Sequence, residues 1–386
     1  MKVFNGNRLK EVRYFRSLTI TKLAEKVGVS KQMISKYENS KSEPDSEHLF
    51  KIIKILNFPS EFFFQRDKFT ENFNGTFYRS RLTATQKQKN PAETIIGAAS
   101  IYVDYLNRYV ELPKIEDLRE ERNEDDINYE LVSQKLRNIW GLGQLPISNL
   151  MDILERHGFI NVLINKKLKK VDAFSRMSSI SIKNISNEYY IIATKSDVSL
   201  FRQQFSLAHE LGHWMLHSKN VDPQSLDMIE YRNMEKEANN FASSFLLPRD
   251  AFVKDFLSYS KVSLDVLKYL KLKWHVSMSS IIMRAHQLGL INERENSNLH
   301  RRMSYNGYKK LEPFDNEYFI NKPRLLKEAT ELIVDNSIIS AEQIPTELSQ
   351  IYGRKFSSEF LSNIVNTEKG YFTDKSKNII NINSIR

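Results

Sequence analysis

Apolar residues between positions 5 and 64 recur at the three- and four-residue spacing of short amphipathic helices. Gly28 suits a tight turn between the second and third helices, and Ser30 suits the N-cap of the third. The segment is therefore predicted to be an all-α bundle. The apolar positions of its four helices are Leu9, Val12 and Phe15, then Leu23, Ala24 and Val27, then Met33, Ile34 and Tyr37, and finally Leu49, Ile52, Ile53 and Leu56.

The pattern changes after this bundle. Residues 66–90 are rich in Thr, Asn, Gln and Lys with little periodicity, which is typical of a linker. A helix is predicted over residues 91–112, and the charged residues 116–126 are typical of a solvated surface.

Short β-type runs appear after residue 128. Residues 159–164 are predicted to form a first strand, and residues 174–183 and 188–193 a hairpin. The run 174–183 is the candidate edge strand, which would hold an extended substrate by β-addition. Helical patterns follow up to residue 289 and return at residues 323–336 and 340–352.

Together these patterns predict a multidomain chain that is mainly α with one α+β part. The all-α bundle covers residues 1–65, and a linker and helical connector cover residues 66–127. An α+β domain with a small sheet covers residues 128–295, and a helical extension of unknown role covers residues 296–386.

Composition and charge narrow the class of protein. The chain has 386 residues and a formal net charge of +10, which favours a polyanionic partner such as nucleic acid. Residues 1–70 hold 14 Lys and Arg against 8 Asp and Glu, so they carry +6 of that charge. The absence of cysteine excludes disulfides and thiolate metal ligands. We expect a cytoplasmic location and no membrane partner, because no apolar run reaches the about 20 residues that span a bilayer.

The apolar segment 205–217 contains the pattern His-Glu-x-x-His, at His209, Glu210 and His213. In a helix, residues four apart share a face, so both imidazoles can bind one zinc ion. Glu210 lies beside that face, where a carboxylate can take a proton from water at the metal and pass it to a leaving amine. The alternative is a buried helix that happens to carry histidines.

A second amphipathic helix is predicted over residues 235–247, and Pro248 ends it. Glu235 and Asn239 lie four residues apart on one face, so Glu235 could complete three protein ligands while Asn239 orients a ligand by a hydrogen bond. His217 lies one turn beyond His213 and is predicted to support the site from outside rather than to bind the metal.

The sequence His-Glu-Leu-Gly-His, followed by Glu-x-x-Ala-Asn-x-Phe-Ala and Leu-Leu-Pro, resembles the ImmA/IrrE metallopeptidases. These are gluzincin-like enzymes in which two histidines and a glutamate bind zinc. The resemblance implies that His209, His213 and Glu235 are the zinc ligands and that Glu210 is the general base.

Two other ligand sets share the His-Glu-x-x-His motif. Glu237 competes for the third ligand position, but Phe241 rather than a polar residue follows it by four positions. A metzincin would have a third histidine six residues after His213, where this chain has Lys219, so that class is excluded.

Residues 19–39 resemble the helix-turn-helix of the phage-repressor and Cro-like family, often labelled XRE, and the match covers residues 5–64. In such a module the third helix enters the major groove of double-stranded DNA and its first turns read base edges. The resemblance also implies a salt bridge between Arg13 and Glu38. The alternative is a helical bundle with a solvated lysine face. The residues expected to face DNA are Ser30, Lys31, Gln32, Ser35 and Lys36.

The leading hypothesis is a DNA-binding transcriptional regulator with a zinc-dependent endopeptidase domain that cleaves a repressor or another regulatory protein. The alternative is a transcription factor or antitoxin-like regulator whose zinc domain senses or binds without proteolysis. The presence of Glu210 favours the first hypothesis. Modules of the Cro type usually act on paired half-sites, so a homodimer is expected.

Overall fold

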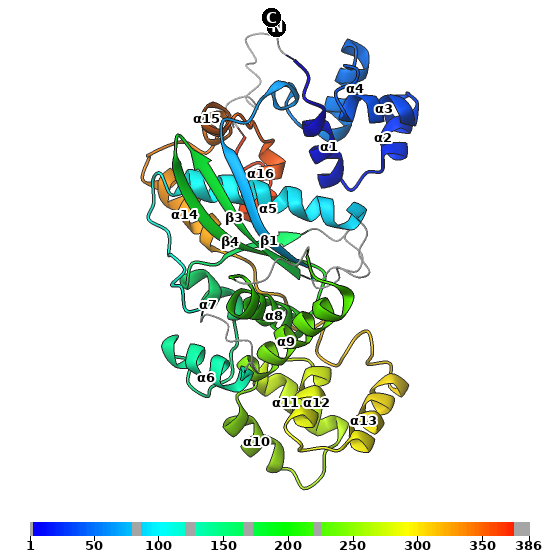
Figure 1. The fold of residues 1–386 in the computed structure, drawn as a ribbon, viewed down its shortest axis with the longest axis vertical. Helices are drawn as coiled ribbons and strands as arrows, with labels where there is room; N and C mark the ends of the chain where they lie inside the picture. Colours follow the sequence, from blue (N-terminus) through cyan, green and yellow to red (C-terminus); the bar gives the residue numbers. More distant parts are fainter. Residues whose placement is uncertain (1–2, 79–85, 120–127, 165–172, 220–224, 374–386) are drawn as a thin grey trace, which may run out of the picture.

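The computed structural model describes residues 3–78, 86–119, 128–164, 173–219 and 225–373. Along the longest axis, the N-terminal helical bundle lies at one end, a four-stranded sheet in the middle, and a group of helices from residues 249–305 at the other end (Figure 1). The predicted class, mainly α with one α+β part, is confirmed. None of the helices in the described ranges is long and apolar enough to span a membrane.

The N-terminal bundle forms where its apolar pattern predicts. Ser30 Oγ accepts a hydrogen bond from the Met33 N–H at 3.1 Å, and Gly28 adopts a left-handed φ of +86°, which glycine adopts without strain. The helices are α1 (Gly6–Phe15), α2 (Ile20–Val27), α3 (Lys31–Glu38) and α4 (Ser46–Leu56), followed by the 3-10 helix η1 (Ser60–Phe64).

Four strands form one sheet: β1 (Thr70–Tyr78), β2 (Ile160–Ile164), β3 (Ala173–Ile182) and β4 (Ile185–Lys195). Their order is β1-β3-β4-β2. β4 pairs antiparallel with β3 and parallel with β2. The hairpin turn lies at Lys183 and Asn184, which both have positive φ, so the hairpin is tighter than the sequence predicted.

Helices cover both faces of the sheet (Figure 1). Helix α5 packs on one face, whereas α7, α8 and α9 lie toward the other, and α6 packs on α9. Their bounds are α5 (Gln86–Leu106), α6 (Tyr129–Ile139), α7 (Leu150–Arg156), α8 (Leu200–His217) and α9 (Met228–Leu246). The helix predicted over residues 91–112 therefore starts and ends earlier than expected.

Alternating residues of β4 explain this arrangement, because successive strand residues point to opposite faces. Tyr189, Ile191 and Ala193 belong to the core that contains α5 and the N-terminal bundle. Tyr190 and Ile192 belong to the core that contains α8 and α9. The helix with the His-Glu-x-x-His motif thus packs against one face of the sheet.

Two predictions about the sheet are wrong. Residues 70–78, within the predicted linker, form strand β1, which pairs antiparallel with β3. β3 therefore has partners on both sides and is not an edge strand. The sequence of β1, Thr-Glu-Asn-Phe-Asn-Gly-Thr-Phe-Tyr, mixes strand-favouring Thr, Phe and Tyr with Glu, Asn and Gly, which are depleted in strands, so local preference alone does not identify it as a strand.

The remaining helices form two groups. The first extends the α8–α9 core to the far end of the molecule and comprises α10 (Arg249–Leu257), α11 (Leu264–Trp274), α12 (Met278–Gln287) and α13 (Glu293–Tyr305). The second returns to the α5 side of the sheet and comprises α14 (Leu325–Asp335), α15 (Ile344–Tyr352) and α16 (Ser358–Val365), of which α16 was not predicted.

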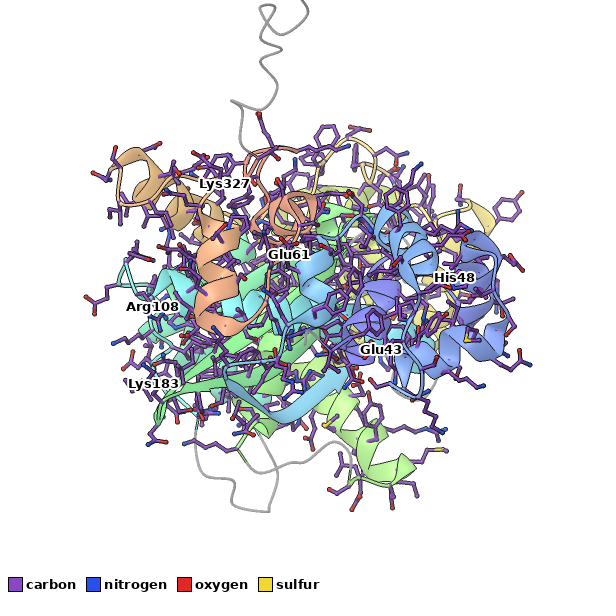
Figure 2. All side chains as sticks on the ribbon, turned by 90° about the horizontal axis from the view of Figure 1, so that it is seen from above. Glu43, His48, Glu61, Arg108, Lys183 and Lys327 are labelled. Atoms are coloured by element: carbon purple, nitrogen blue, oxygen red, sulfur yellow. The ribbon has the colours of Figure 1, made fainter. Side chains whose placement is uncertain are left out.

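Helix α16 connects the C-terminal helices to the N-terminal bundle. The ring of Phe360 lies 4.3 Å from that of Phe15 and 5.3 Å from that of Phe58, centroid to centroid. Arg16 Nη2 donates to Glu359 Oε2 at 2.8 Å. Viewed along the long axis, the bundle residue His48 and the hairpin-turn residue Lys183 lie on opposite sides of the molecule (Figure 2).

Candidate metal centre and nucleic-acid interface

Helix α8 is buried along most of its length. Ser199 caps its start by accepting a hydrogen bond from the Arg202 N–H. Because the helix is enclosed by the sheet and α9, the side chains of His209, Glu210 and His213 are all fully buried. Buried polar groups of this kind require partners, and the surrounding elements supply them.

Gly212 allows α8 and α9 to approach closely. A Cβ atom at this position would lie 3.0 Å from Cδ1 of Phe241 and 3.1 Å from the carbonyl oxygen of Ala238. Both atoms belong to a packed core and cannot move away without cost. The close packing brings Glu235 and Asn239 of α9 opposite the histidines of α8.

Three potential ligands converge between the two helices. The Nε2 atoms of His209 and His213 are 3.0 Å apart. Glu235 lies 3.5 Å from each, through Oε2 to His209 and through Oε1 to His213. Ligand atoms bonded to zinc at about 2.0–2.1 Å with tetrahedral angles lie about 3.3 Å apart, so these separations fit one shared ion. Across the described ranges, this is the one group of three such side chains whose ligand atoms lie within 4.8 Å of one another.

Hydrogen bonds to the Nδ1 atoms of His209 and His213 favour the tautomer that can bind a metal through Nε2. His209 Nδ1 lies 3.1 Å from Oδ1 of Asn239, an acceptor, so this nitrogen carries the proton. His217 Nε2 lies 2.8 Å from Oε2 of Glu237 and donates to it. The Nδ1 of His217 is therefore the acceptor of its 3.1 Å contact with Nδ1 of His213. In both ligand candidates the proton sits on Nδ1, which leaves Nε2 available to a metal.

The charge at the cluster also suits a cation. One ionised carboxylate and two neutral imidazoles are a common donor set of zinc sites that keep a position open. The residues present therefore fit the zinc ion that the sequence predicts.

Glu210 is held by two residues that the sequence analysis did not identify. Ser175 Oγ on β3 donates to Glu210 Oε2 at 2.6 Å and lies 2.8 Å from the hydroxyl of Tyr190 on β4. Burial, followed by the charge of Glu210, raises the pKa of Tyr190 far above its usual value, so its hydroxyl keeps its proton and donates to Ser175. Both residues lie on the sheet face that packs on α8. A polar residue on the apolar face of a predicted strand was the available signal.

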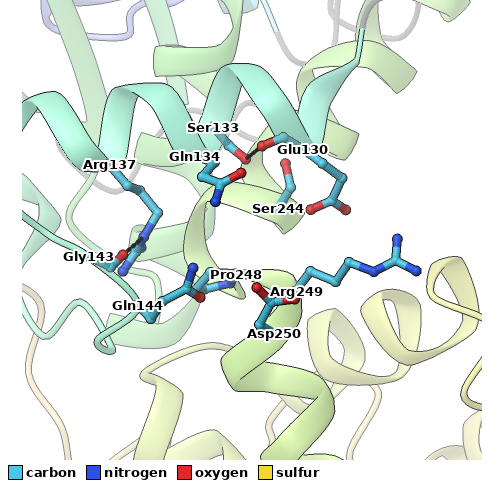
Figure 3. A pocket seen from close by; sticks show the side chains of 10 residues that line it. All are labelled: Glu130, Ser133, Gln134, Arg137, Gly143, Gln144, Ser244, Pro248, Arg249 and Asp250. Atoms are coloured by element: carbon cyan, nitrogen blue, oxygen red, sulfur yellow. Dashed lines mark hydrogen bonds between the residues drawn. The ribbon is translucent and has the colours of Figure 1, made fainter.

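The pocket in Figure 3 is separate from this centre. It measures about 90 Å³, and Arg137 occupies one side, where it donates to the carbonyl oxygens of Gly143 at 2.7 Å and Phe245 at 2.6 Å. The bond to Phe245 fastens α6 to α9, and the bond to Gly143 fixes the loop that follows α6, so we interpret the pocket as structural. Its lining consists of Glu130, Ser133, Gln134, Arg137, Gly143, Gln144, Ser244, Pro248, Arg249 and Asp250.

Helix α3 presents the predicted DNA-facing residues to solvent. Its inner side is fixed by Ile34 and Tyr37, which are buried in the bundle core. The helix lies on the outer side of the bundle, away from α5 (Figure 1). Ser30, Lys31, Gln32 and Lys36 are exposed, and Ser35 is half-buried.

The predicted salt bridge between Arg13 and Glu38 is confirmed. Arg13 Nη2 donates to Glu38 Oε2 at 2.8 Å, and its Nε donates to the other carboxylate oxygen. Both side chains are buried. Burial lowers the pKa of Arg13, but Glu38 raises it overall, so the guanidinium stays charged. The pair locks α1 to α3 and thereby fixes the angle at which α3 is presented.

A helix-turn-helix with an exposed third helix, joined to a domain with a buried His-Glu-x-x-His centre, defines a DNA-binding regulator with a metallopeptidase-like domain. Comparison with protein families supports both parts of this description. Residues 9–63 match the helix-turn-helix family, and residues 160–286 match the peptidase family of IrrE N-terminal-like domains. None of the curated proteins matches the chain. The chain is thus a fusion of an XRE-type helix-turn-helix with an IrrE-like peptidase-family domain.

Proposed function

We propose that this DNA-binding regulator is a zinc-dependent endopeptidase that cleaves a repressor or another regulatory protein. The observation that carries the proposal is the position of Glu210. Its carboxylate is fixed by Ser175 and neighbours a histidine pair whose Nε2 atoms converge with Glu235.

Each residue has a role in this proposal. His209, His213 and Glu235 hold the ion, and a bound zinc ion supplies a Lewis acid that makes water and a peptide carbonyl more reactive. Glu210 takes a proton from the attacking water and passes it to the leaving nitrogen. Ser175 keeps the Glu210 carboxylate in one orientation, so that little reorganisation is needed during the reaction.

The N-terminal bundle gives the peptidase its location. Residues 1–70 carry +6 of the net charge, and the exposed start of α3 is shaped to read a major groove. A target that binds the same DNA site would therefore meet the peptidase at high local concentration.

A zinc domain that senses or binds without cutting is the second candidate. The pairing of β1 with β3 favours it, because β1 lies along the strand that contacts Glu210. A chain fixed in this arrangement would keep its metal and its DNA binding without proteolysis.

The substitution Glu210→Gln separates the two candidates. For a peptidase, the variant keeps its zinc and its DNA affinity but cleaves a quenched fluorescent peptide library about 100- to 10,000-fold more slowly, as expected for loss of a general base. In a transcription reporter, both Glu210→Gln and Gln32→Ala should then change the output. An effect of Gln32→Ala alone would leave a regulator whose zinc domain does not cut.

A further inference from the structure

We propose that β1 is an internal occupant of a peptide-binding edge on β3 and competes with substrate for it. The inference rests on the proposed peptidase function and specifies how that site is regulated. It assigns β3 a backbone surface for an extended polypeptide and names residues 70–78 of this chain as the segment that covers it.

The register places β1 beside the catalytic carboxylate. Phe77 pairs with Ser175, and Tyr78 pairs with Phe174. Ser175 is the residue whose hydroxyl lies 2.6 Å from Glu210 Oε2. An extended substrate held against this part of β3 would use the same backbone N–H and C=O groups that β1 now uses. Substrate and β1 therefore exclude each other.

The other side of β3 cannot serve this purpose. β3 and β4 are joined by a two-residue turn and pair along their whole length, from Ala173 with Thr194 to Ile182 with Ile185. Several of their side chains belong to the two cores. The β4 side is therefore a permanent part of the fold, and the β1 side is the one that can open.

Two features weaken the pairing of β1 with β3. Its register shifts between Asn74 and Thr76, around Gly75, and a bulge of this kind interrupts the ladder. Glu71 brings a carboxylate against α5, where a Cβ on Gly97 would lie 3.4 Å from it, and burial raises the pKa of Glu71. Removing this carboxylate from water opposes the pairing of β1.

The occupant is also attached to the DNA-binding bundle. β1 starts shortly after η1, and the Lys68 N–H between them donates to the carbonyl oxygen of Tyr352 at 3.1 Å. Because Tyr352 belongs to α15, this bond also fixes the start of β1 to the C-terminal helices.

A reversible lock tests the proposal, because the chain contains no cysteine of its own. Asn74 and Met177 are paired across β1 and β3, so Asn74→Cys with Met177→Cys can join the strands by a disulfide. Oxidation should lower cleavage of the peptide library about tenfold or more, as expected when the competent state becomes ten times rarer, and reduction should restore it. The matched control is Ser181→Cys with Ser186→Cys, which joins β3 to β4 and should leave cleavage unchanged.

A binding measurement gives a second readout. The probe is a fluorescently labelled peptide of residues 70–78, added to the full-length chain that carries Glu210→Gln. Adjacent strand residues direct their N–H groups to opposite sides, so only one of Phe77→Pro and Tyr78→Pro removes a bond to β3. We expect one of these two variants to bind the peptide and the other to resemble the parent chain.

The outcomes separate this proposal from the proposed function. Equal cleavage by the oxidised and reduced chains would overturn the occupancy of the edge while leaving the peptidase intact. The chain could instead cleave nothing, whether oxidised or reduced, and still bind the peptide only when the disulfide is reduced. This result would support the occupancy of the edge and reject the peptidase. Peptide binding that is equal in the oxidised and reduced chains would also overturn the occupancy.

Discussion

Nε2 of His217 donates to Oε2 of Glu237 over 2.8 Å, which places Glu237 at the outer end of a chain of side chains rather than at the metal. Glu237 follows Glu235 by two residues, and two residues turn a helix by about 200°. The two carboxylates of α9 therefore point in different directions. Glu237 supports His217, which in turn supports His213.

This arrangement predicts different metal contents for two alanine variants of α9. Glu235→Ala removes one of three ligands, so the purified chain should lose its zinc during dialysis against a weak chelator. Glu237→Ala should keep about one zinc per chain under the same conditions. Elemental analysis by mass spectrometry checks the result, and the reverse order would show that Glu237 is the ligand.

The hydrogen bonds of Asn239 to His209 and of His217 to His213 should affect the affinity for zinc rather than the number of zinc ions bound. Asn239→Ala and His217→Ala should each weaken zinc binding by about 10- to 100-fold, because the ligand rings lose the groups that orient them. Competition with a chromogenic chelator measures this. Asn240→Ala is the matched control, since Asn240 contacts Gln287 instead of a histidine. Equal affinities for Asn239→Ala and the parent chain would contradict the assigned tautomers.

Ser175 should matter for turnover and not for metal content. Ser175→Ala leaves the Glu210 carboxylate without its donor on β3, so we expect kcat to fall by about 10- to 100-fold with zinc retained. Ser179→Ala on the same strand is the control, because the Ser179 hydroxyl contacts only Ser186 among the bonds described for it. Similar cleavage rates for Ser175→Ala and Ser179→Ala would show that Ser175 does not position Glu210.

DNA binding should depend on salt and on the exposed start of α3. The affinity of the full chain for a duplex that it selects from a random pool should fall steeply with salt, because bound phosphates release counterions. Gln32→Ala should cost about 1–3 kcal/mol at one base pair, whereas Lys36→Ala should weaken all sequences alike. Lys54→Ala, at an exposed lysine of α4, is the control. Binding that is insensitive to salt would reassign the bundle to protein docking.

Glu155 on α7 should make stability depend on pH. Its carboxylate accepts hydrogen bonds from the N–H groups of Arg324 and Leu325, and burial raises its pKa from 4.5 to about 7. Because the folded pKa lies above the unfolded one, the contribution is fully present below pH 4.5 and is lost as the pH rises through 7.

The test compares urea unfolding of the parent chain and Glu155→Gln between pH 5 and pH 8. The amide stays neutral, so the variant should gain roughly 1–3 kcal/mol relative to the parent across this range. Glu342→Gln, at an exposed glutamate, should show no such trend. A constant difference between parent and Glu155→Gln would show that the folded pKa is not raised.

Features that depend on residues close together in the sequence were predictable from it. Gly28 and Ser30 fix the helix-turn-helix by a left-handed turn and a cap. The spacing of His209 and His213 places both on a common face of α8. These properties belong to a few consecutive positions, so they need no knowledge of the rest of the fold.

Features that arise from distant pairing were not predictable. β1 is a strand because β3 offers it an edge, and its own sequence is polar with little alternation. Ser175 of β3 and Tyr190 of β4 lie far from Glu210 of α8 in the sequence, and serine and tyrosine are ordinary residues in strands. Helix α16 was not predicted, although Ser357 caps it and Phe360, Leu361, Ile364 and Val365 recur at helical spacing; what the sequence does not show is that this face covers Phe15 and Phe58.

The contact between α16 and the bundle joins two parts of the chain that are synthesised far apart in time. Arg16 and Glu359 are 343 residues apart, and translation at about 5–20 residues per second covers that distance in roughly 20–70 s. During this interval the nascent bundle already presents α3, while its Phe15 and Phe58 side chains still lack the cover of Phe360. The bundle is therefore completed long after its own helices have been synthesised, and a chain that stops before α16 carries an uncovered aromatic patch on the bundle that presents α3.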